Sequence, residues 1–446
     1  MTGISTNPDP SPPLGEALRF WFRLGWVSFG GPAGQIALMH AELVEKRRWI
    51  GEKRFLHALN YCMVLPGPEA QQLATYIGWL MHRSLGGIVA GTLFILPSLF
   101  LLIGLSWAYV ALGQNSVVAG LFYGIKPAVT AIVVQAAWRI GSRTLRNTIL
   151  RVIALAAFIG IFALQIPFPA IVLSAALAGI ALARLAPSAF AQSPSHAPAA
   201  KAQGPALIDD DTPLAPHTRF RKGRTIAVLG IGLLAWCLPM GLLTLALGWQ
   251  HMFTQMGWFF TKAALLTFGG AYAVLPYVHQ GAVMHYGWVT PAQMIDGLAL
   301  GESTPGPLIM VVAFVAFVGA WGAAPLGGEH AFAAAALAAA LVTWFTFLPS
   351  FVFILAGAPF VESTHGRIGF SAPLTAISAA VVGVILNLGL FFALHVFWPT
   401  GWDGAFEAPA ALIALLAAIA LMRFGRGVME TLAVCAALGL GWTLIA

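Results

Sequence analysis

Long apolar stretches almost free of charge place the strongest limit on how this chain can fold. Residues 86–110 and 331–353 contain no charged side chain. At 1.5 Å per residue, a helix of about 20 residues crosses the roughly 30 Å hydrocarbon core of a bilayer. Hydrophobic residues make up 59% of the 446 residues and charged residues only 9%, and a water-soluble fold cannot hide so much apolar surface. The sequence therefore predicts an all-α integral membrane protein.

Apolar runs separated by helix breakers predict about thirteen transmembrane helices. We expect a cytoplasmic tail at 1–16, a first transmembrane repeat at 17–185, a flexible cytoplasmic linker at 186–224, a connecting helix at 225–248 and a second repeat at 249–446. The predicted spans lie near 17–39, 55–81, 86–111, 117–138, 149–165, 168–185, 225–248, 256–278, 293–320, 332–357, 370–396, 407–422 and 428–445.

Basic residues predict the orientation, because cytoplasmic loops are rich in Lys and Arg. With the N-terminus in the cytoplasm, the basic residues at 139–151 and the run at 219–224 fall inside, while Asp403 falls outside. An odd number of spans puts the C-terminus on the periplasmic side. The basic loop at 40–55 would also fall outside, so either the first span is re-entrant or this loop folds into a cavity.

The N-terminal segment is polar and Pro-rich, unlike a signal peptide. We expect the spans themselves to direct insertion into a bacterial inner membrane. The net charge of +7 comes from short basic runs between apolar segments, which argues against a nucleic-acid partner.

An internal repeat reveals the architecture. At an offset of 239 residues, the interval from FGG to PGP is the same in both halves and needs no gap. Ten identities recur in register: Phe29, Gly30, Gly31, His40, Val44, Trp49, Leu59, Pro66, Gly67 and Pro68 match Phe268, Gly269, Gly270, His279, Val283, Trp288, Leu298, Pro305, Gly306 and Pro307. Because the two copies start on opposite sides, we expect an inverted-topology repeat with a substrate site between them.

The two PGP triplets, Pro66–Gly67–Pro68 and Pro305–Gly306–Pro307, lie in the middle of apolar segments. Proline removes a backbone donor and interrupts a helix, so each span is predicted to be two half-helices. The half-helix that starts after each triplet presents free N–H groups and a positive dipole end, which suit an anion. The alternative is a kink that serves packing alone.

The FGG doublets, Gly30–Gly31 and Gly269–Gly270, allow positive φ or close backbone approach. We place them at the same site as the PGP breaks. Helix packing through small residues is the alternative.

Basic residues at membrane depth are costly and often functional. Arg23 and Lys262 lie six residues before each FGG and are the candidate pair for an oxyanion clamp. Their alternative is snorkelling to the interface. Lys126, beside Pro127, is a further candidate for substrate binding, with a helix-end or headgroup role as its alternative.

Two carboxylates flank the breaks and are candidate proton carriers: Glu69 follows Pro68, and Glu302 precedes Pro305. Glu69 could instead cap its half-helix. Three polar residues near the breaks could hydrogen-bond an oxyanion, with capping or packing as their alternative: Gln71, Ser303 and Thr304.

The sequence contains no catalytic triad order, Walker loop or dinucleotide fingerprint. Its three cysteines stand singly, and His40 and His279 have no further ligands nearby. We therefore expect neither an enzyme, a cofactor nor a metal site, and transport driven by a gradient.

The segments FWFRLGWVSFGGPAGQ, EKRRWI, LPGPEAQQLATYIGW, TFGGAYAVLP and GLALGESTPGPL resemble the paired signatures of the chromate ion transporter family, in its long two-domain form. Ala271 stands where many relatives have another glycine. The resemblance implies export of chromate by antiport with protons, resistance to chromate, and competition by sulfate. A sulfate or other oxyanion carrier and an anion channel are the alternatives, and a homodimer is a candidate assembly.

Overall fold

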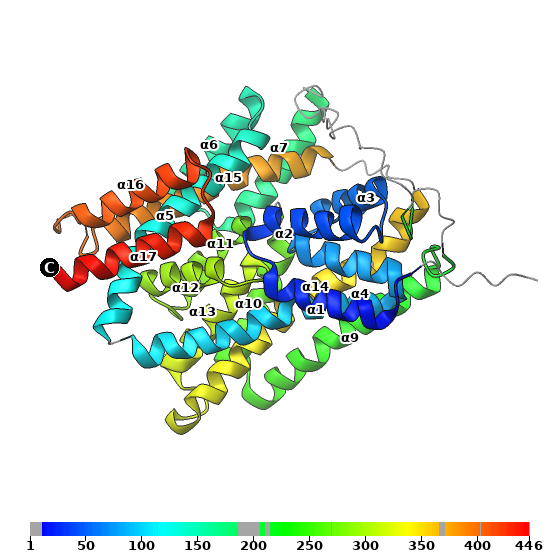
Figure 1. The fold of residues 1–446 in the computed structure, drawn as a ribbon, viewed down its shortest axis with the longest axis horizontal. Helices are drawn as coiled ribbons and strands as arrows, with labels where there is room; N and C mark the ends of the chain where they lie inside the picture. Colours follow the sequence, from blue (N-terminus) through cyan, green and yellow to red (C-terminus); the bar gives the residue numbers. More distant parts are fainter. Residues whose placement is uncertain are drawn as a thin grey trace, which may run out of the picture.

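A computed structural model describes residues 11–113, 115–185, 206–209, 215–268, 270–364, 371–401 and 403–445. These residues are mostly helical, with one isolated bridge between Ile50 and Ile208 (Figure 1). The first half contains α1 (Leu14–Val27), α2 (Gly31–His40), the π-helix η1 (Ala41–Lys46), α3 (Glu52–Val64), α4 (Glu69–Leu112), α5 (Ser116–Thr144), α6 (Thr148–Phe162) and α7 (Phe168–Leu185).

The second half repeats this order after the connecting helix α9 (Lys222–Leu247). Its elements are α10 (Met252–Leu266), α11 (Ala271–His279), the π-helix η2 (Gln280–His285), α12 (Pro291–Ser303), η3 (Leu308–Met310), α13 (Val311–Ala323), η4 (Gly328–His330), α14 (Ala331–Thr364), α15 (Ser371–Phe397), α16 (Ala408–Met422) and α17 (Val428–Ile445). Both π-helices and the helices α3 and α12 keep the 239-residue offset of the sequence repeat.

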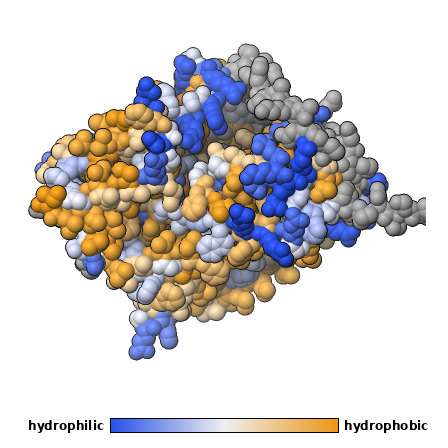
Figure 2. Space-filling model, viewed as in Figure 1, coloured by the Kyte–Doolittle hydropathy of each residue, from blue (hydrophilic) through white to orange (hydrophobic). Residues whose placement is uncertain are grey.

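Seven helices among the described residues are long and apolar enough to cross a membrane. They are α4, α5, α7, α9, α14 with its preceding turn, α15 and α17. The exterior fits a lipid environment: apolar surface covers the part around α16 and α17, while hydrophilic residues gather over α1 to α3 (Figure 2). The predicted all-helical membrane protein is confirmed.

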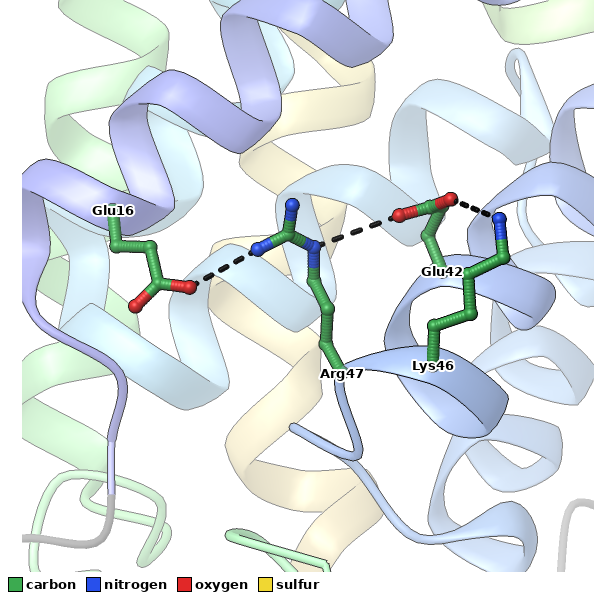
Figure 3. A network of polar contacts seen from close by, with 4 residues as sticks. All are labelled: Glu16, Glu42, Lys46 and Arg47. Carbon is green, nitrogen blue, oxygen red and sulfur yellow. Dashed lines mark hydrogen bonds and ion pairs between the residues drawn. The ribbon is translucent and has the colours of Figure 1, made fainter.

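The first predicted span, 17–39, is a hairpin of two helices. Arg47, just after η1, lies with its Nη1 3.0 Å from Oε1 of Glu16 at the start of α1 (Figure 3). The rings of Phe20 and Trp49 lie 5.3 Å apart. Because the chain turns at the FGG motif between α1 and α2, both outer ends of this pair lie together. This hairpin has the shape that a re-entrant first span requires.

The predicted span 55–81 also doubles back, which corrects the expectation of two half-helices in line. Arg54 at the start of α3 lies 3.8 Å from Glu362 of α14, and the hydroxyl of Tyr76 donates to the same carboxylate over 2.6 Å. In one straight helix, residues 54 and 76 would be about 33 Å apart. The PGP break is therefore the tip of a hairpin rather than a kink in a crossing helix.

Predicted span 293–320 is a hairpin of the same kind. A methyl group added at Gly297 of α12 would lie 2.3 Å from the ring of Phe314 in α13. Span 256–278 likewise divides: the ring of Phe259 in α10 lies 5.7 Å from that of Tyr286, which follows η2. Each half thus contributes two helical hairpins, with FGG at one tip and PGP at the other.

Helix α4 is itself two antiparallel parts. His82 and Arg83 have non-helical angles, with φ of +57° at Arg83. The parts pack closely through small residues, since a methyl group at Gly78 would lie 2.5 Å from the carbonyl oxygen of Gly86, and one at Gly87 would lie 2.8 Å from that of Thr75. Residues 69–81 complete the second hairpin, and residues 84–112 are long enough to cross the membrane.

Two described stretches of the predicted linker dock on the first half; the rest of it lies outside the described residues. The N–H of Ile208 donates to the carbonyl of Trp49 over 3.0 Å, and the Ile208 side chain is buried. Nε2 of His217 donates to the carbonyl of Trp79 at 3.1 Å, and Arg224 donates to the hydroxyl of Ser84 at 3.0 Å. These contacts define one end of the molecule, the linker end.

The large helices pack crosswise between the halves. Helix α5 contacts α16 and α17 of the second half, and α15 contacts α6 and α7 of the first half. Their apolar faces form one large core, which includes Val133, Phe168, Val384 and Leu432. Because helices of each half pack on helices of the other, the two halves form one body, and the hairpins lie between them.

Candidate functional site

The hairpin tips of the two halves meet through a reciprocal pair of backbone hydrogen bonds. The N–H of Gly67 donates to the carbonyl of Thr267 over 2.7 Å, and the N–H of Gly306 donates to the carbonyl of Ser28 over 2.9 Å. Both donors and both acceptors are related by the 239-residue offset. Each PGP tip therefore meets the FGG turn of the other half, at a place we call the junction.

The residue before each FGG motif, Ser28 or Thr267, supplies the carbonyl that accepts the bond from the opposite PGP tip. Ser28 and Thr267 donate their hydroxyls to carbonyls four residues earlier, Leu24 at 2.6 Å and Ala263 at 2.7 Å. These bonds occupy carbonyls at the ends of α1 and α10, which otherwise lack intrahelical partners. The main-chain carbonyls of Ser28 and Thr267 then remain available to the opposite PGP glycine.

Four helices start at the junction: α2, α4, α11 and η3, which leads into α13. Among the described residues, none of these four starts has a side-chain cap. A helix start leaves its first N–H groups unpaired and carries a partial positive charge. Two of these starts, α4 and α11, flank the Gly67–Thr267 bond, and the other two, α2 and η3, flank the Gly306–Ser28 bond. Such donors are suited to an anion.

The junction requires its glycines. Gly67 and Gly306 have φ of +127° and +106°, a region that side chains rarely adopt. A methyl group at Gly67 would lie 2.3 Å from Oγ of Ser350, and one at Gly306 would lie 2.7 Å from Cβ of Ser98. The two serines end the LPS motifs of α14 and α4, so each PGP tip also contacts the long helix of the other half.

The FGG turns also use the predicted backbone freedom. Gly30 and Gly31 have φ of +88° and +68°, and Gly270 has φ of +99°. Gly269 lies outside the described residues. The predicted use of these glycines to form tight turns beside the PGP tips therefore agrees with Gly30, Gly31 and Gly270.

Both candidate proton carriers gather around the second FGG turn. Glu69 opens α4, and its Oε1 lies 3.9 Å from the place of a Cβ on Gly270. Glu302 is buried and accepts a hydrogen bond from the hydroxyl of Tyr272. Within the described part of the chain, the Glu69 carboxylate makes no hydrogen bond or ion pair, so one carboxylate is held and the other is free to move.

The polar candidates divide into two groups. Ser303 and Thr304 donate their hydroxyls to the carbonyls of Leu300 and Gly301, so both close the end of α12. Gln71 is buried and donates to Thr75 at 2.9 Å. Its carbonyl oxygen has no partner in the described residues.

Sequence reasoning missed Gln35, which donates to the carbonyls of Gly306 at 2.5 Å and Ser28 at 3.2 Å. Its position in the second half is Val274, so a search for repeated residues passes over it. Gln72 donates to the carbonyl of Pro66 at 2.8 Å. Two glutamines therefore brace the PGP tips from the side.

The basic candidates lie in different hairpins. Arg23 is exposed on α1, and Nζ of Lys262 lies 5.6 Å from the centre of the Trp258 ring. The structure records no contact between Arg23 and Lys262. They occupy equivalent positions in different hairpins, and each belongs to its own half.

Lys126 has a partner that the sequence did not suggest. Its Nζ lies 3.5 Å from Oδ2 of Asp296 on α12, and the hydroxyl of Tyr109 donates to the same oxygen at 2.8 Å. The Asp296 side chain is almost fully buried, and its Oδ1 has no partner in the described residues. This ion pair joins α12 to α5, away from the helix starts of the junction.

The two halves are not in equivalent conformations. Helix α12 packs on α5 and α17, whereas α3 packs chiefly on α4. As a result Met63 of α3 is 54% exposed and its repeat equivalent Glu302 is 5% exposed. At the turns, Phe29 is 39% exposed whereas its equivalent Phe268 is half-buried, and Pro32 is half-buried whereas its equivalent Ala271 is 1% exposed. The first FGG turn is open and the second is closed.

Comparisons with known proteins now identify the family. The family model described as Chromate transporter matches residues 15–180 and 254–442. The chain is 27% identical over 422 residues to the chromate transport protein of Cupriavidus metallidurans, covering 95% of this chain and 91% of the relative. It is 33% identical over 390 residues to the chromate transport protein of Pseudomonas aeruginosa, covering 86% of this chain and 82% of the relative.

A probable chromate transport protein of Synechococcus elongatus is 25% identical over 423 residues, with 95% of this chain and 93% of the relative covered. No solved structure matches the chain. These relatives are transporters rather than enzymes, as the resemblance in the sequence predicted. The chain belongs to the chromate transporter family.

Proposed function

We propose that this protein exports chromate across the inner membrane in exchange for protons, and that the junction binds the oxyanion. The observation that carries the proposal is the meeting of four uncapped helix starts at the reciprocal bonds of Gly67 and Gly306. Such an array stabilises a tetrahedral dianion through N–H donors and dipoles without a metal. Export confers resistance by lowering the chromate concentration in the cytoplasm.

Glu69 and Glu302 are the proposed proton carriers. An uncompensated carboxylate is costly to bury, so an empty site with both acids ionised resists the conformational change. Protonation removes that cost for the return step. Chromate moves outward in one step, and the proton moves inward in the return step, when the site holds no chromate.

The arrangement of the hairpins supports an inverted topology with the linker end in the cytoplasm. The first-half hairpins start at the linker end. Helix α9 also starts there, at Arg224 beside Ser84, and its 26 residues reach the other end. The second-half hairpins then start from the periplasmic side. In this proposed topology the basic 40–55 loop lies in the cytoplasm, as the positive-inside rule expects.

The unequal halves support alternating access. In an inverted repeat, the second state is obtained when the two halves exchange conformations. Here α3 stands away from the crossed bundle and α12 packs on it. In the opposite state α12 would leave α5, the Lys126–Asp296 pair would separate, and α3 would pack on α15 and α7.

We expect chromate to accumulate in inside-out membrane vesicles that have an acid-inside pH gradient. Outward proton flow then drives uptake, because the vesicle interior corresponds to the periplasm. Radiolabelled chromate uptake, with and without a protonophore, measures this. Uptake unaffected by the protonophore would contradict proton exchange, and accumulation of sulfate alone would favour the sulfate carrier. Movement that never exceeds equilibrium would favour a channel.

The variants Glu69→Gln and Glu302→Gln are expected to uncouple transport from the pH gradient. A neutral amide keeps the shape of the protonated acid but cannot release a proton, so gradient-driven uptake should fall by about tenfold or more, equivalent to about 1.4 kcal/mol. Exchange of chromate for chromate at equal pH should persist. The control is Glu329→Gln, an exposed acid in η4. If Glu69→Gln or Glu302→Gln lost exchange as well, that residue would belong to binding instead.

Topology is tested with cysteines at repeat-equivalent positions, Lys46→Cys and His285→Cys, in a Cys237→Ser background that removes the exposed native cysteine. A membrane-impermeant maleimide added to intact spheroplasts should label position 285 and not position 46. In inside-out vesicles the preference should reverse. A permeant maleimide labels both in either preparation and serves as the control. Labelling of both positions from one side would rule out the inverted arrangement.

A further inference from the structure

A cavity of about 740 Å³ lies beside the second FGG hairpin. Its walls come from α10, α11, η2, α15 and the turn between α6 and α7. Eight of its described lining residues carry polar or basic side chains that can donate a hydrogen bond: Gln165, Lys262, Tyr277, His279, Gln280, His285, Tyr286 and Asn387. None of the described lining residues is acidic. Most of the other lining side chains are apolar. The basic side chains, without a carboxylate beside them, favour an anionic ligand.

One of these side chains, His279, lacks the partner that burial normally requires, and the half-buried Lys262 lies nearby on the same wall. His279 is 6% exposed, its ring centre lies 4.0 Å from that of Phe391, and its Nε2 has no hydrogen-bond partner in the described residues. Lys262 has the ring of Trp258 beside it and no ion pair within the described part of the chain. Buried polar atoms are nearly always paired, so an unpaired nitrogen on a cavity wall indicates a ligand.

Gln280 adds a donor at the same wall. Its side-chain oxygen accepts the N–H of Phe168 at 3.0 Å, which fixes the amide and leaves its NH₂ group to donate. Together the Lys262 ammonium, the His279 ring and the Gln280 amide supply one charge and several donors. That set matches the oxygens of a tetrahedral oxyanion.

The cavity lies close to the junction. Lys262 is five residues before Thr267 on α10, which corresponds to about 7.5 Å along the helix. Thr267 accepts the hydrogen bond from Gly67 at the junction. An anion at Lys262 is therefore about one and a half helical turns from the helix starts.

We propose that this cavity is a vestibule that binds a tetrahedral oxyanion between the junction and the end of the molecule opposite the linker. The proposal rests on the function proposed above and assigns Lys262 to one side of the transport path. Arg23, at the equivalent position on α1, belongs to the path from the linker end. The two cations thus bind the same substrate one after the other, at different points along the transport path, and do not act as a single clamp.

The test compares KM for chromate presented from each side, using vesicles of both orientations. Lys262→Ala should raise the KM for chromate offered from the periplasmic side by about tenfold or more, the usual effect of losing a charged hydrogen bond. The KM from the cytoplasmic side should stay unchanged. Lys262→Arg should restore most of the lost affinity. Lys222→Ala, which removes an exposed lysine at the start of α9, is the matched control.

A second measurement follows the cavity directly and does not depend on transport rates. Met284 lines the cavity and is exposed, so Met284→Cys in the Cys237→Ser background should react with a cationic thiol reagent in nanodiscs of phosphatidylcholine. Chromate should slow that reaction reversibly, so that full reactivity returns once chromate is removed, which excludes oxidation of the cysteine by chromate. The slowing should not occur when Lys262→Ala is added. Chloride at equal ionic strength is the control.

The outcomes separate the vestibule from the proposed function. If the unmodified protein moves no chromate, the proposed function fails. If it transports chromate but Lys262→Ala raises KM equally from both sides, or chromate does not protect position 284, the vestibule is overturned. If phosphatidylglycerol in the nanodisc protects position 284 and chromate does not, the cavity holds a lipid headgroup and the proposal is wrong.

Discussion

Replacing Gly67 by alanine is expected to abolish chromate transport and to destabilise the protein. The φ of +127° costs a residue with a side chain about 1–3 kcal/mol. The added methyl group would also lie 2.3 Å from Oγ of Ser350 and 2.6 Å from Nε2 of Gln72. Relief of that overlap requires the side chains of Ser350 and Gln72 to shift, which breaks the bond from Gln72 to the carbonyl of Pro66. Together with the strained φ at the donor to Thr267, this loss should open the junction. Vesicle uptake and the thermal unfolding midpoint in detergent measure the two effects.

Gly104→Ala in α4 and Gly241→Ala in α9 are the matched controls for this prediction. Neither position has an atom within 4 Å of the added methyl group or a positive φ. Both variants should transport at the rate of the unmodified protein. Gly306→Ala, at the repeat-related tip, should resemble Gly67→Ala. Normal uptake by Gly67→Ala would show that the reciprocal bond is not required.

The second large effect is expected at the ion pair between α5 and α12. Lys126→Met should destabilise the protein by about 3 kcal/mol, because it leaves Asp296 buried without its cation. Asp296→Asn should cost less, since the Lys126 side chain is 31% exposed and can still reach a polar environment. Thermal unfolding of the purified variants in one detergent measures the order of stabilities.

The double variant Lys126→Met/Asp296→Asn tests the cause. If the loss comes from an uncompensated charge, neutralising both partners should recover most of the stability lost in Lys126→Met. The same double variant should also relax the packing of α12 on α5 and increase maleimide labelling of a cysteine at Ala299, which is buried here. Additive losses in the double variant would assign the effect of Lys126 to its packing alone.

Local signals in the sequence predicted much of this protein. Long apolar runs without charge predicted that the protein lies in a membrane, because charged side chains are costly in lipid and are rare in membrane-spanning segments. The matching FGG and PGP motifs predicted the repeat, the helix breaks and the positions that need positive φ. Each of these properties depends on neighbouring residues, or on one residue's own backbone, and so can be inferred without contacts.

Other features depended on residues far apart in the chain. A proline–glycine break ends a helix but does not set the direction of the next one, so 55–81 and 293–320 turned out to be hairpins. Ser303 and Thr304 are near the predicted site, yet their hydroxyls close α12 instead. The role of Lys126 became visible only with Asp296 beside it. The sequence by itself determined a membrane protein of two related halves with broken helices. Only the tertiary structure decided which broken ends meet, because that choice depends on packing energies summed over the whole crossed bundle.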